Sequence, residues 1–155
     1  MSPEQADAEL LITRTFDAPA PLVFSMWSDP KHMKHWLGPH GFECRFAEID
    51  FRVGGSYRAM IYSAEQGENW FGGVYREIEP YRRLVFTYTW DAGPSAGVAT
   101  LVTIELEEVA GRTVQRFHQA GFLDVERRDS HVGGWTEAFE HQQSYVAKLC
   151  KEQTQ

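Results

Sequence analysis

The amino-acid sequence predicts a single α+β domain in which an antiparallel sheet packs against one long helix near the C-terminus. Residues 133–150 place apolar side chains at helical spacing, and this is the longest helical signal in the chain. Most of the chain between residue 41 and this helix is divided by turn residues into short β-rich segments. The links between these segments are short, so neighbouring strands are expected to be antiparallel.

The chain before the sheet predicts one strand and two short helices. Residues 9–16 form the expected strand. Pro19 and Pro21 then suit the first turn of a helix, because the N–H that proline lacks has no partner at that position. A second short helix is expected at residues 32–36, closed by the glycine- and proline-rich loop at residues 38–41.

Six further strands are expected after these helices. They are predicted at residues 43–51, 56–64, 70–78, 84–90, 98–108 and 113–122. Strict alternation from Leu84 to Trp90 places every second residue on the inner face of the sheet. The last strand is ambiguous by pattern alone. Burying Arg116 without a partner would cost several kcal/mol, so Phe117 is expected inside and His118 outside.

Composition describes an ordinary folded chain with an unusual share of rings. The 155 residues suit one domain over residues 9–151, with a disordered N-terminus at residues 1–8 and a flexible tail at residues 152–155. Aromatic content is 14%, which suits either core packing or the lining of a pocket. The net charge of −7 argues against nucleic acid as a partner. Because no apolar run is long enough to span a membrane, we expect no membrane partner and a cytoplasmic location.

Two patterns suggest chemistry but have simpler structural explanations. The segment Gly93–Gly97 matches the GxSxG motif of nucleophile elbows, which requires a helix after the serine. A strand is expected on either side, so the segment is predicted to be a hairpin loop. His32, His35 and His40 form a cluster, but no carboxylate or cysteine ligand is obvious nearby. We therefore expect surface histidines and no metal or other cofactor.

The titratable residues of the strands leave catalysis open. Glu48 and Asp50 share a strand face, where paired carboxylates could act as acid and base. The simpler interpretation is an ion pair between Asp50 and Arg52 or Arg58. His118 would be a candidate base if it faced inward, which the favoured parity excludes.

Several spaced motifs resemble a known family. The motifs are Trp36-x-Gly38-Pro39, Asp50-x-Arg52-x-Gly54-Gly55-x-Tyr57, Gly73-x-Tyr75-x-x-Ile78-x-Pro80-x-x-x-Leu84 and Gly134-Trp135. Together they resemble the domain shared with the C-terminal part of the heat-shock chaperone ATPase activator, in the START-like, birch-pollen-allergen-like superfamily (SRPBCC). The resemblance implies a helix-grip fold of about six to seven strands around the C-terminal helix, over a hydrophobic cavity.

We expect this cavity to bind a small apolar ligand, in contact with a set of mostly aromatic side chains. The candidate ligand-binding residues are Trp36, Met60, Trp70, Tyr88, Trp90, Phe117, Gln119, Trp135 and Phe139. Gln119, together with Gln115 and Gln142, would supply polar groups to the cavity if these side chains face inward.

Three functions remain open from the sequence. The favoured one is a non-catalytic binding or carrier module for an apolar, aromatic or lipid-like molecule. The second is a small-molecule enzyme, such as a cyclase or hydrolase, which the superfamily also contains. The third is a protein-interaction module that contacts a chaperone or forms a homodimer, which an exposed apolar patch would support.

Overall fold

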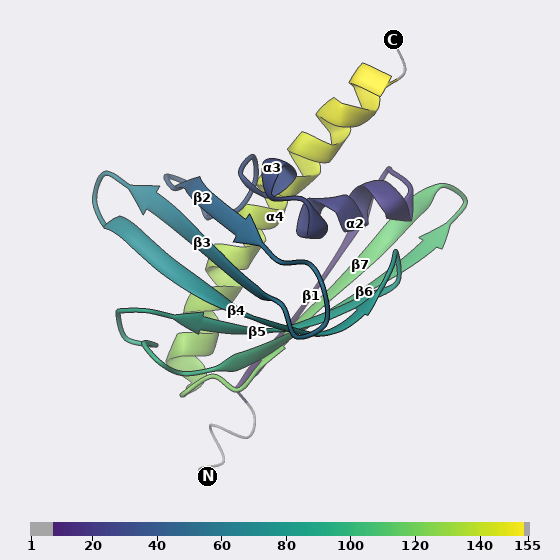
Figure 1. The fold of residues 1–155 in the computed structure, drawn as a ribbon. Coiled ribbons are helices and arrows are strands. Elements are labelled where there is room, and N and C mark those ends of the chain that lie inside the picture. The colour runs from purple at the N-terminus through teal and green to yellow at the C-terminus, as the bar shows by residue number, and fades with distance from the viewer. Residues whose placement is uncertain (1–7, 154–155) are drawn as a thin grey trace.

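The computed structural model describes residues 8–153 as one curved, seven-stranded sheet that surrounds a long C-terminal helix (Figure 1). The elements are β1 (Glu9–Phe16), α2 (Ala20–Ser28), α3 (Pro30–Met33), β2 (Glu43–Ile49), β3 (Ser56–Ser63), β4 (Gly67–Glu79), β5 (Arg83–Trp90), β6 (Thr100–Val109), β7 (Arg112–Ala120) and α4 (Val125–Gln153). The predicted α+β class, the strand count and the two short helices are confirmed.

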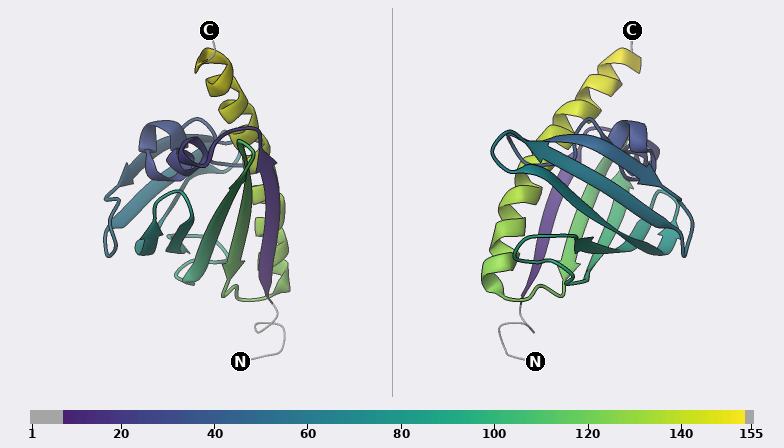
Figure 2. Two further views of the ribbon diagram at one scale, coloured as in Figure 1. Left: turned by 90° about the vertical axis from the view of Figure 1, so that its right-hand side faces the viewer. Right: turned by 60° about the vertical axis from the view of Figure 1, so that its left-hand side comes forward.

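Every neighbouring pair of strands in the sheet is antiparallel. The strand order is β1-β7-β6-β5-β4-β3-β2, so the first strand joins the last one and β2 forms the opposite edge. Figure 2 shows the sheet bending strongly between these two edges, with α4 lying along β1. The bend leaves a concave face that the helix and its side chains must fill.

The core between α4 and the sheet is built from packed rings. The ring centroid of Phe117 on β7 lies 4.6 Å from that of Trp135 and 5.2 Å from that of Phe139, both on α4. Trp27 of α2 packs against the same three rings, with centroid distances of 6.0 to 6.2 Å. Trp135 and Phe139 meet the sheet together because residues four apart lie on one face of a helix.

The inward parity predicted for β7 is confirmed. Phe117 is fully buried, as are the alternate residues Thr113, Gln115 and Gln119. Arg116 faces outward and pairs with Glu107 at 3.1 Å. Burying the alternate face would have removed this guanidinium from water, so the charge fixes the parity of the strand.

Helix α4 is longer than the sequence pattern indicated. It begins at Val125, so the lead-in before residue 133, which the sequence left open between helix and irregular structure, is helical. Its first turn is capped by the Asp124 carboxylate, which accepts a hydrogen bond from the Arg127 N–H at 2.8 Å. It also continues to Gln153, into the segment expected to be a flexible tail. At the other end, Ala8 is buried although residues 1–8 were expected to be disordered. Residues 1–7 and 154–155 lie outside the described part of the chain.

Smaller boundary differences have local causes. Helix α3 spans Pro30–Met33 rather than residues 32–36, because the Asp29 carboxylate accepts a hydrogen bond from the Lys31 N–H and starts the helix earlier. Strand β7 ends at Ala120, two residues early. Gly121 follows with a φ of +98°, a conformation that ends the extended strand.

Candidate functional site

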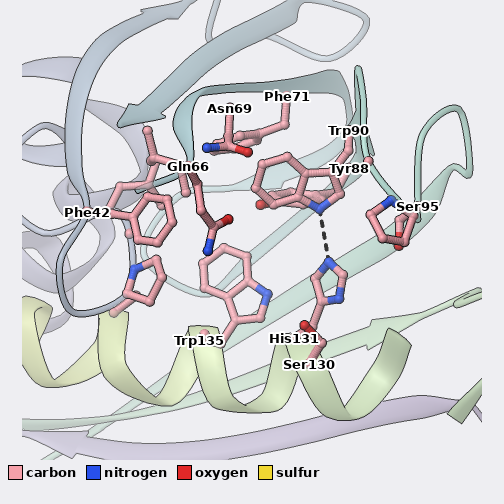
Figure 3. A pocket seen from close by; sticks show the side chains of 18 of the residues that line it. Phe42, Gln66, Asn69, Phe71, Tyr88, Trp90, Ser95, Ser130, His131 and Trp135 are labelled. Carbon is pink, nitrogen blue, oxygen red and sulfur yellow. Dashed lines mark hydrogen bonds between the residues drawn. The ribbon is translucent and has the colours of Figure 1, made fainter. Parts of the chain in front are cut away.

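A pocket of about 330 Å³ opens beside the N-terminal half of α4 (Figure 3). The helix forms its floor, and strands β3, β4 and β5 form one wall. The loops at residues 37–42 and 92–95 complete the rim. The lining residues are Leu37, Gly38, Pro39, Phe42, Ile61, Gln66, Asn69, Phe71, Tyr88, Trp90, Ala92, Gly93, Pro94, Ser95, Arg127, Ser130, His131, Gly134, Trp135 and Ala138.

One face of α4 supplies the floor of the pocket. Its lining residues are Arg127, Ser130, His131, Gly134, Trp135 and Ala138, which recur three and four residues apart. A Cβ atom added at Gly134 would meet nothing within 4 Å. The absent side chain at this position is therefore part of the open volume of the pocket.

Aromatic rings form the deeper wall. Phe71 and Trp90 are register partners on β4 and β5, with ring centroids 5.0 Å apart. The ring centroid of Tyr88 lies 4.7 Å from that of Phe71 and 5.6 Å from that of Trp135, so Tyr88 links the wall to the helix. Burial raises the pKa of the Tyr88 hydroxyl well above its ordinary value, so it stays protonated at neutral pH.

His131 is held in one tautomer at the edge of this wall. The indole N–H of Trp90 donates to Nε2 of His131 at 3.0 Å, as the dashed line in Figure 3 shows. Nδ1 must then carry the proton of the neutral ring, and it donates to the Arg127 carbonyl oxygen at 2.7 Å. Burial lowers the pKa of His131, although the hydrogen bond to Arg127 opposes this shift. The imidazole is therefore neutral, with both nitrogens engaged.

Of the nine candidate ligand-binding residues, three line the pocket: Tyr88, Trp90 and Trp135. Trp36, Phe117 and Phe139 are instead packed in the solid core, each exposed by 1% or less. The indole N–H of Trp36 donates to the Met26 carbonyl oxygen at 3.2 Å. These rings support the fold below the pocket.

Met60 and Trp70 face away from the pocket. They are register partners on β3 and β4, and their sequence neighbours Ile61 and Phe71 line the pocket instead. Successive side chains on a strand point to opposite faces, so Met60 and Trp70 belong to the outer face. There Trp70 packs against Phe46 with centroids 5.3 Å apart.

Two of the three buried glutamines accept hydrogen bonds from tryptophan side chains and do not line the pocket. The Trp135 indole N–H donates to Oε1 of Gln119 at 2.8 Å, and Gln119 in turn donates to the Thr100 hydroxyl at 2.8 Å. Gln115 accepts from the Trp27 indole at 2.9 Å and donates to Gln142 at 3.2 Å. None of the three glutamines lines the pocket, and Gln115 and Gln119 hold the Trp27 and Trp135 rings in place.

The other titratable candidates lie outside the pocket. Nε2 of His118 is 3.1 Å from the Glu9 carboxylate on the outer face of the sheet. Asp50 pairs with Arg52 at 3.0 Å, as the simpler interpretation held, whereas Arg58 pairs with Asp91 at 2.7 Å.

The three histidines of the cluster contact different parts of α4: His32 and His35 contact Tyr145, and His40 contacts carboxylates. Nδ1 of His32 lies 2.7 Å from the Tyr145 hydroxyl, and His35 stacks on the same ring at 4.6 Å. Nε2 of His40 is 3.0 Å from the Glu140 carboxylate. Within residues 8–153, no group of three His, Cys, Asp or Glu side chains is arranged to hold a metal ion.

The GxSxG segment is a loop, as predicted, but it contributes to the site. Residues 91–99 connect β5 to β6 with no helix after Ser95, so the geometry of a nucleophile elbow is absent. Gly93, Pro94 and Ser95 nevertheless form part of the rim of the pocket.

Sequence reasoning missed several lining residues, among them Phe71, His131 and Arg127. The larger neighbouring Trp70 was chosen in place of Phe71, because strand alternation allows only one of them on the inner face. His131 and Arg127 lie four and eight residues before Trp135, in a stretch that the sequence left open between helix and irregular structure, with its charged run expected on a solvated face. Extending the helical period backward from Trp135 would have placed both on its inner face.

The fold and the pocket define a class of protein: an α+β domain whose curved sheet surrounds a C-terminal helix and leaves a small-molecule-sized space beside it. Residues 17–147 match the family model described as activator of Hsp90 ATPase homolog 1-like protein (AHSA1), and the chain belongs to this family. The resemblance drawn from the sequence motifs is thereby confirmed.

Solved structures show the same fold. A protein from Chromobacterium violaceum is 27% identical, with a TM-score of 0.79 over 88% of this chain and 95% of that chain. A protein from Arthrobacter aurescens is 22% identical, with a TM-score of 0.81 over 95% and 90% of the two chains. The AHSA1 protein from Silicibacter pomeroyi is 20% identical, with a TM-score of 0.79 over 91% and 99%. No curated protein matches this chain in sequence.

Among the helices of the described residues, none combines the length and apolar character that a membrane span requires.

Proposed function

We propose that this domain binds a small aromatic or other apolar molecule in the pocket beside α4, without catalysing a reaction. The observation that carries the proposal is the pocket itself, about 330 Å³ in volume and lined by the rings of Phe42, Phe71, Tyr88, Trp90 and Trp135. Ligand sites are typically about 300–1,000 Å³ and mostly apolar, with a few polar groups. The aromatic wall offers stacking surfaces, and the rim supplies the polar groups.

The state of His131 supports binding rather than catalysis. A general base needs an available lone pair within reach of the substrate proton. Nε2 of His131 already accepts the Trp90 N–H, and Nδ1 donates to a backbone carbonyl. An enzymatic role would require the Trp90–His131 hydrogen bond to break when substrate enters.

The distribution of exposed apolar side chains also supports a small ligand over a protein partner. Leu37 is buried and Phe42 lines the pocket, so the segment at residues 37–42 offers no broad apolar surface. The exposed large apolar side chains of the described chain come from separate strands and turns: Leu11, Val53, Val74, Tyr81, Leu101, Val109 and Leu123.

The test is a titration of the purified protein with phenylnaphthylamine, a neutral fluorophore that brightens in apolar surroundings. We expect saturable binding at one probe per chain. Energy transfer from tryptophan to probe should accompany it, because Trp90 and Trp135 line the site. A signal that rises linearly without saturation, or that is equal for the unfolded chain, would contradict the proposal.

A further inference from the structure

The pocket carries one formal charge in a protein of net charge −7. Among the lining residues within 8–153, Arg127 is the side chain charged at neutral pH, and no Asp or Glu is present. Burial of His131 lowers its pKa, and the hydrogen bond that Nε2 accepts from the Trp90 indole requires this nitrogen to be unprotonated, so the ring is neutral. The excess negative charge of the protein therefore lies outside the pocket, and the one charged residue that lines the pocket is a cation.

The guanidinium of Arg127 is incompletely satisfied. Its Nη1 lies 3.4 Å from a carboxylate oxygen of Glu126, but the Glu126 side chain is 85% exposed, so solvent screens the pair. Nε of Arg127 is buried and has no hydrogen-bond acceptor in the described part of the chain. A buried donor without an acceptor is costly, and an acceptor brought by a ligand would remove this cost.

The position of Arg127 gives the pocket a polar end. Arg127 lies one helical turn before His131, in the first turn of α4, where the helix dipole adds positive potential. Its backbone N–H is already bonded to Asp124, so the side chain rather than the helix terminus is available to an anion. Figure 3 shows Ser95 and Ser130 on the same side as His131, with Phe42 opposite. Two hydroxyls therefore lie on the His131 side of the pocket, and Ser130 follows Arg127 by three residues on the same helix.

We propose that the ligands of this pocket are small aromatic molecules bearing a carboxylate or similar anionic group, which Arg127 binds while the rings stack against the aromatic wall. This inference rests on the proposed binding function and specifies its ligand class. Guanidinium groups suit carboxylates because their N–H donors form paired, charge-assisted hydrogen bonds.

Two probe molecules that differ by one charged group test the inference. Anilinonaphthalene sulfonate and phenylnaphthylamine share the same ring system, and only the former carries an anion. Both are titrated into the wild type, Arg127→Met, Arg127→Lys and Arg116→Met. Arg116 is the matched control, since it lies on the outer face of the sheet and its replacement removes the same charge.

We expect Arg127→Met to weaken anilinonaphthalene sulfonate binding roughly tenfold or more, because it removes a hydrogen bond between charged groups. Arg127→Lys should weaken binding less, because lysine keeps the positive charge. Phenylnaphthylamine affinity should change less than about twofold in every variant, as no charge contact is lost. In competition, naphthoate should displace phenylnaphthylamine more effectively than naphthamide does, and this preference should disappear in Arg127→Met.

The outcomes separate the two proposals. If phenylnaphthylamine binds but Arg127→Met and Arg116→Met weaken the sulfonate equally, or naphthoate has no advantage over naphthamide, the anionic ligand class is overturned and the binding function stands. If phenylnaphthylamine fails to bind the wild type, the binding function itself is refuted. Circular dichroism spectra and melting curves of the variants establish that each one is folded.

Discussion

Filling the pocket from its floor should abolish ligand binding while stabilising the protein. Gly134 lines the pocket from the interior of α4, and a Cβ atom there meets nothing within 4 Å. The substitution Gly134→Leu projects an isobutyl group into the space between the helix and the aromatic wall. Gly133, the preceding residue, also has open space around its Cβ position, but it is exposed and does not line the pocket. The two substitutions introduce the same side chain, but only the one at Gly134 points into the pocket.

The expected magnitudes follow from the backbone and the pocket separately. Glycine inside a helix is less favourable than a good helix former by about 1 kcal/mol, so both substitutions should stabilise the fold. For a domain of this size, that gain raises Tm by roughly 2–4 °C. Only Gly134→Leu occupies ligand space. A ligand that must be compressed or excluded should lose at least roughly tenfold in affinity, which corresponds to about 1.4 kcal/mol.

The assay is phenylnaphthylamine titration of wild type, Gly134→Leu and Gly133→Leu, with Tm measured by circular dichroism. We expect loss of binding in Gly134→Leu, unchanged binding in Gly133→Leu and a higher Tm in both. Equal probe affinity in the two variants would show that the probe binds elsewhere. A lower Tm in Gly134→Leu alone would show that the space is already filled by core packing.

Two further predictions concern the polar groups beneath and beside the pocket. Gln119→Leu leaves the buried Trp135 N–H without its acceptor, so urea unfolding should show a loss of about 1–3 kcal/mol; a change near zero would mean that water replaces the amide. For His131, burial lowers the folded-state pKa below its ordinary value of 6.5. As pH falls below 6.5 the unfolded chain takes up this proton first, so the contribution of His131 to stability is complete above 6.5 and declines toward the lowered folded pKa. His131→Gln keeps an acceptor for Trp90 but does not titrate, so unfolding measured across this range should be less pH-dependent than in the wild type, and identical profiles would exclude His131 as a cause.

The fold was accessible from the sequence because its patterns are strong and local. Alternation along β5 and β6 and the helical spacing around Phe139 each reflect burial on one face, which any folded chain must achieve. Parity in β7 followed from one charged side chain, Arg116. The beginning of α4 was harder to place, because the first turns carry the charged run at residues 126–129. Asp124 caps the helix there, but the first turns show no apolar stripe by which the sequence pattern could mark the start of the helix.

The site was accessible only in part, since large aromatic residues occupy core and pocket alike. Phe139 and Trp135 are both large aromatic residues one helical turn apart, yet the former lies wholly in the core and the latter also lines the pocket. That difference depends on how far the sheet bends away from the helix, which is a property of the assembled structure. The sequence of β4 did not decide which of its two faces is the inner one. Choosing the larger ring placed Trp70 inside in place of Phe71.

The division along α4 explains how one helix supports both a core and a pocket. From Phe139 through Gln142 to Val146, its inner residues are exposed by 1% or less and pack against rings and the Gln115 amide. From Arg127 to Gly134, the residues that line the open volume are partly buried or, at Ser130, exposed. The segment from Phe139 to Val146 can therefore hold the helix against the sheet while the N-terminal half leaves open space. Changes of ligand preference should thus arise from Arg127, Ser130 and Gly134 with little loss of stability, because the packing that fixes the helix lies elsewhere.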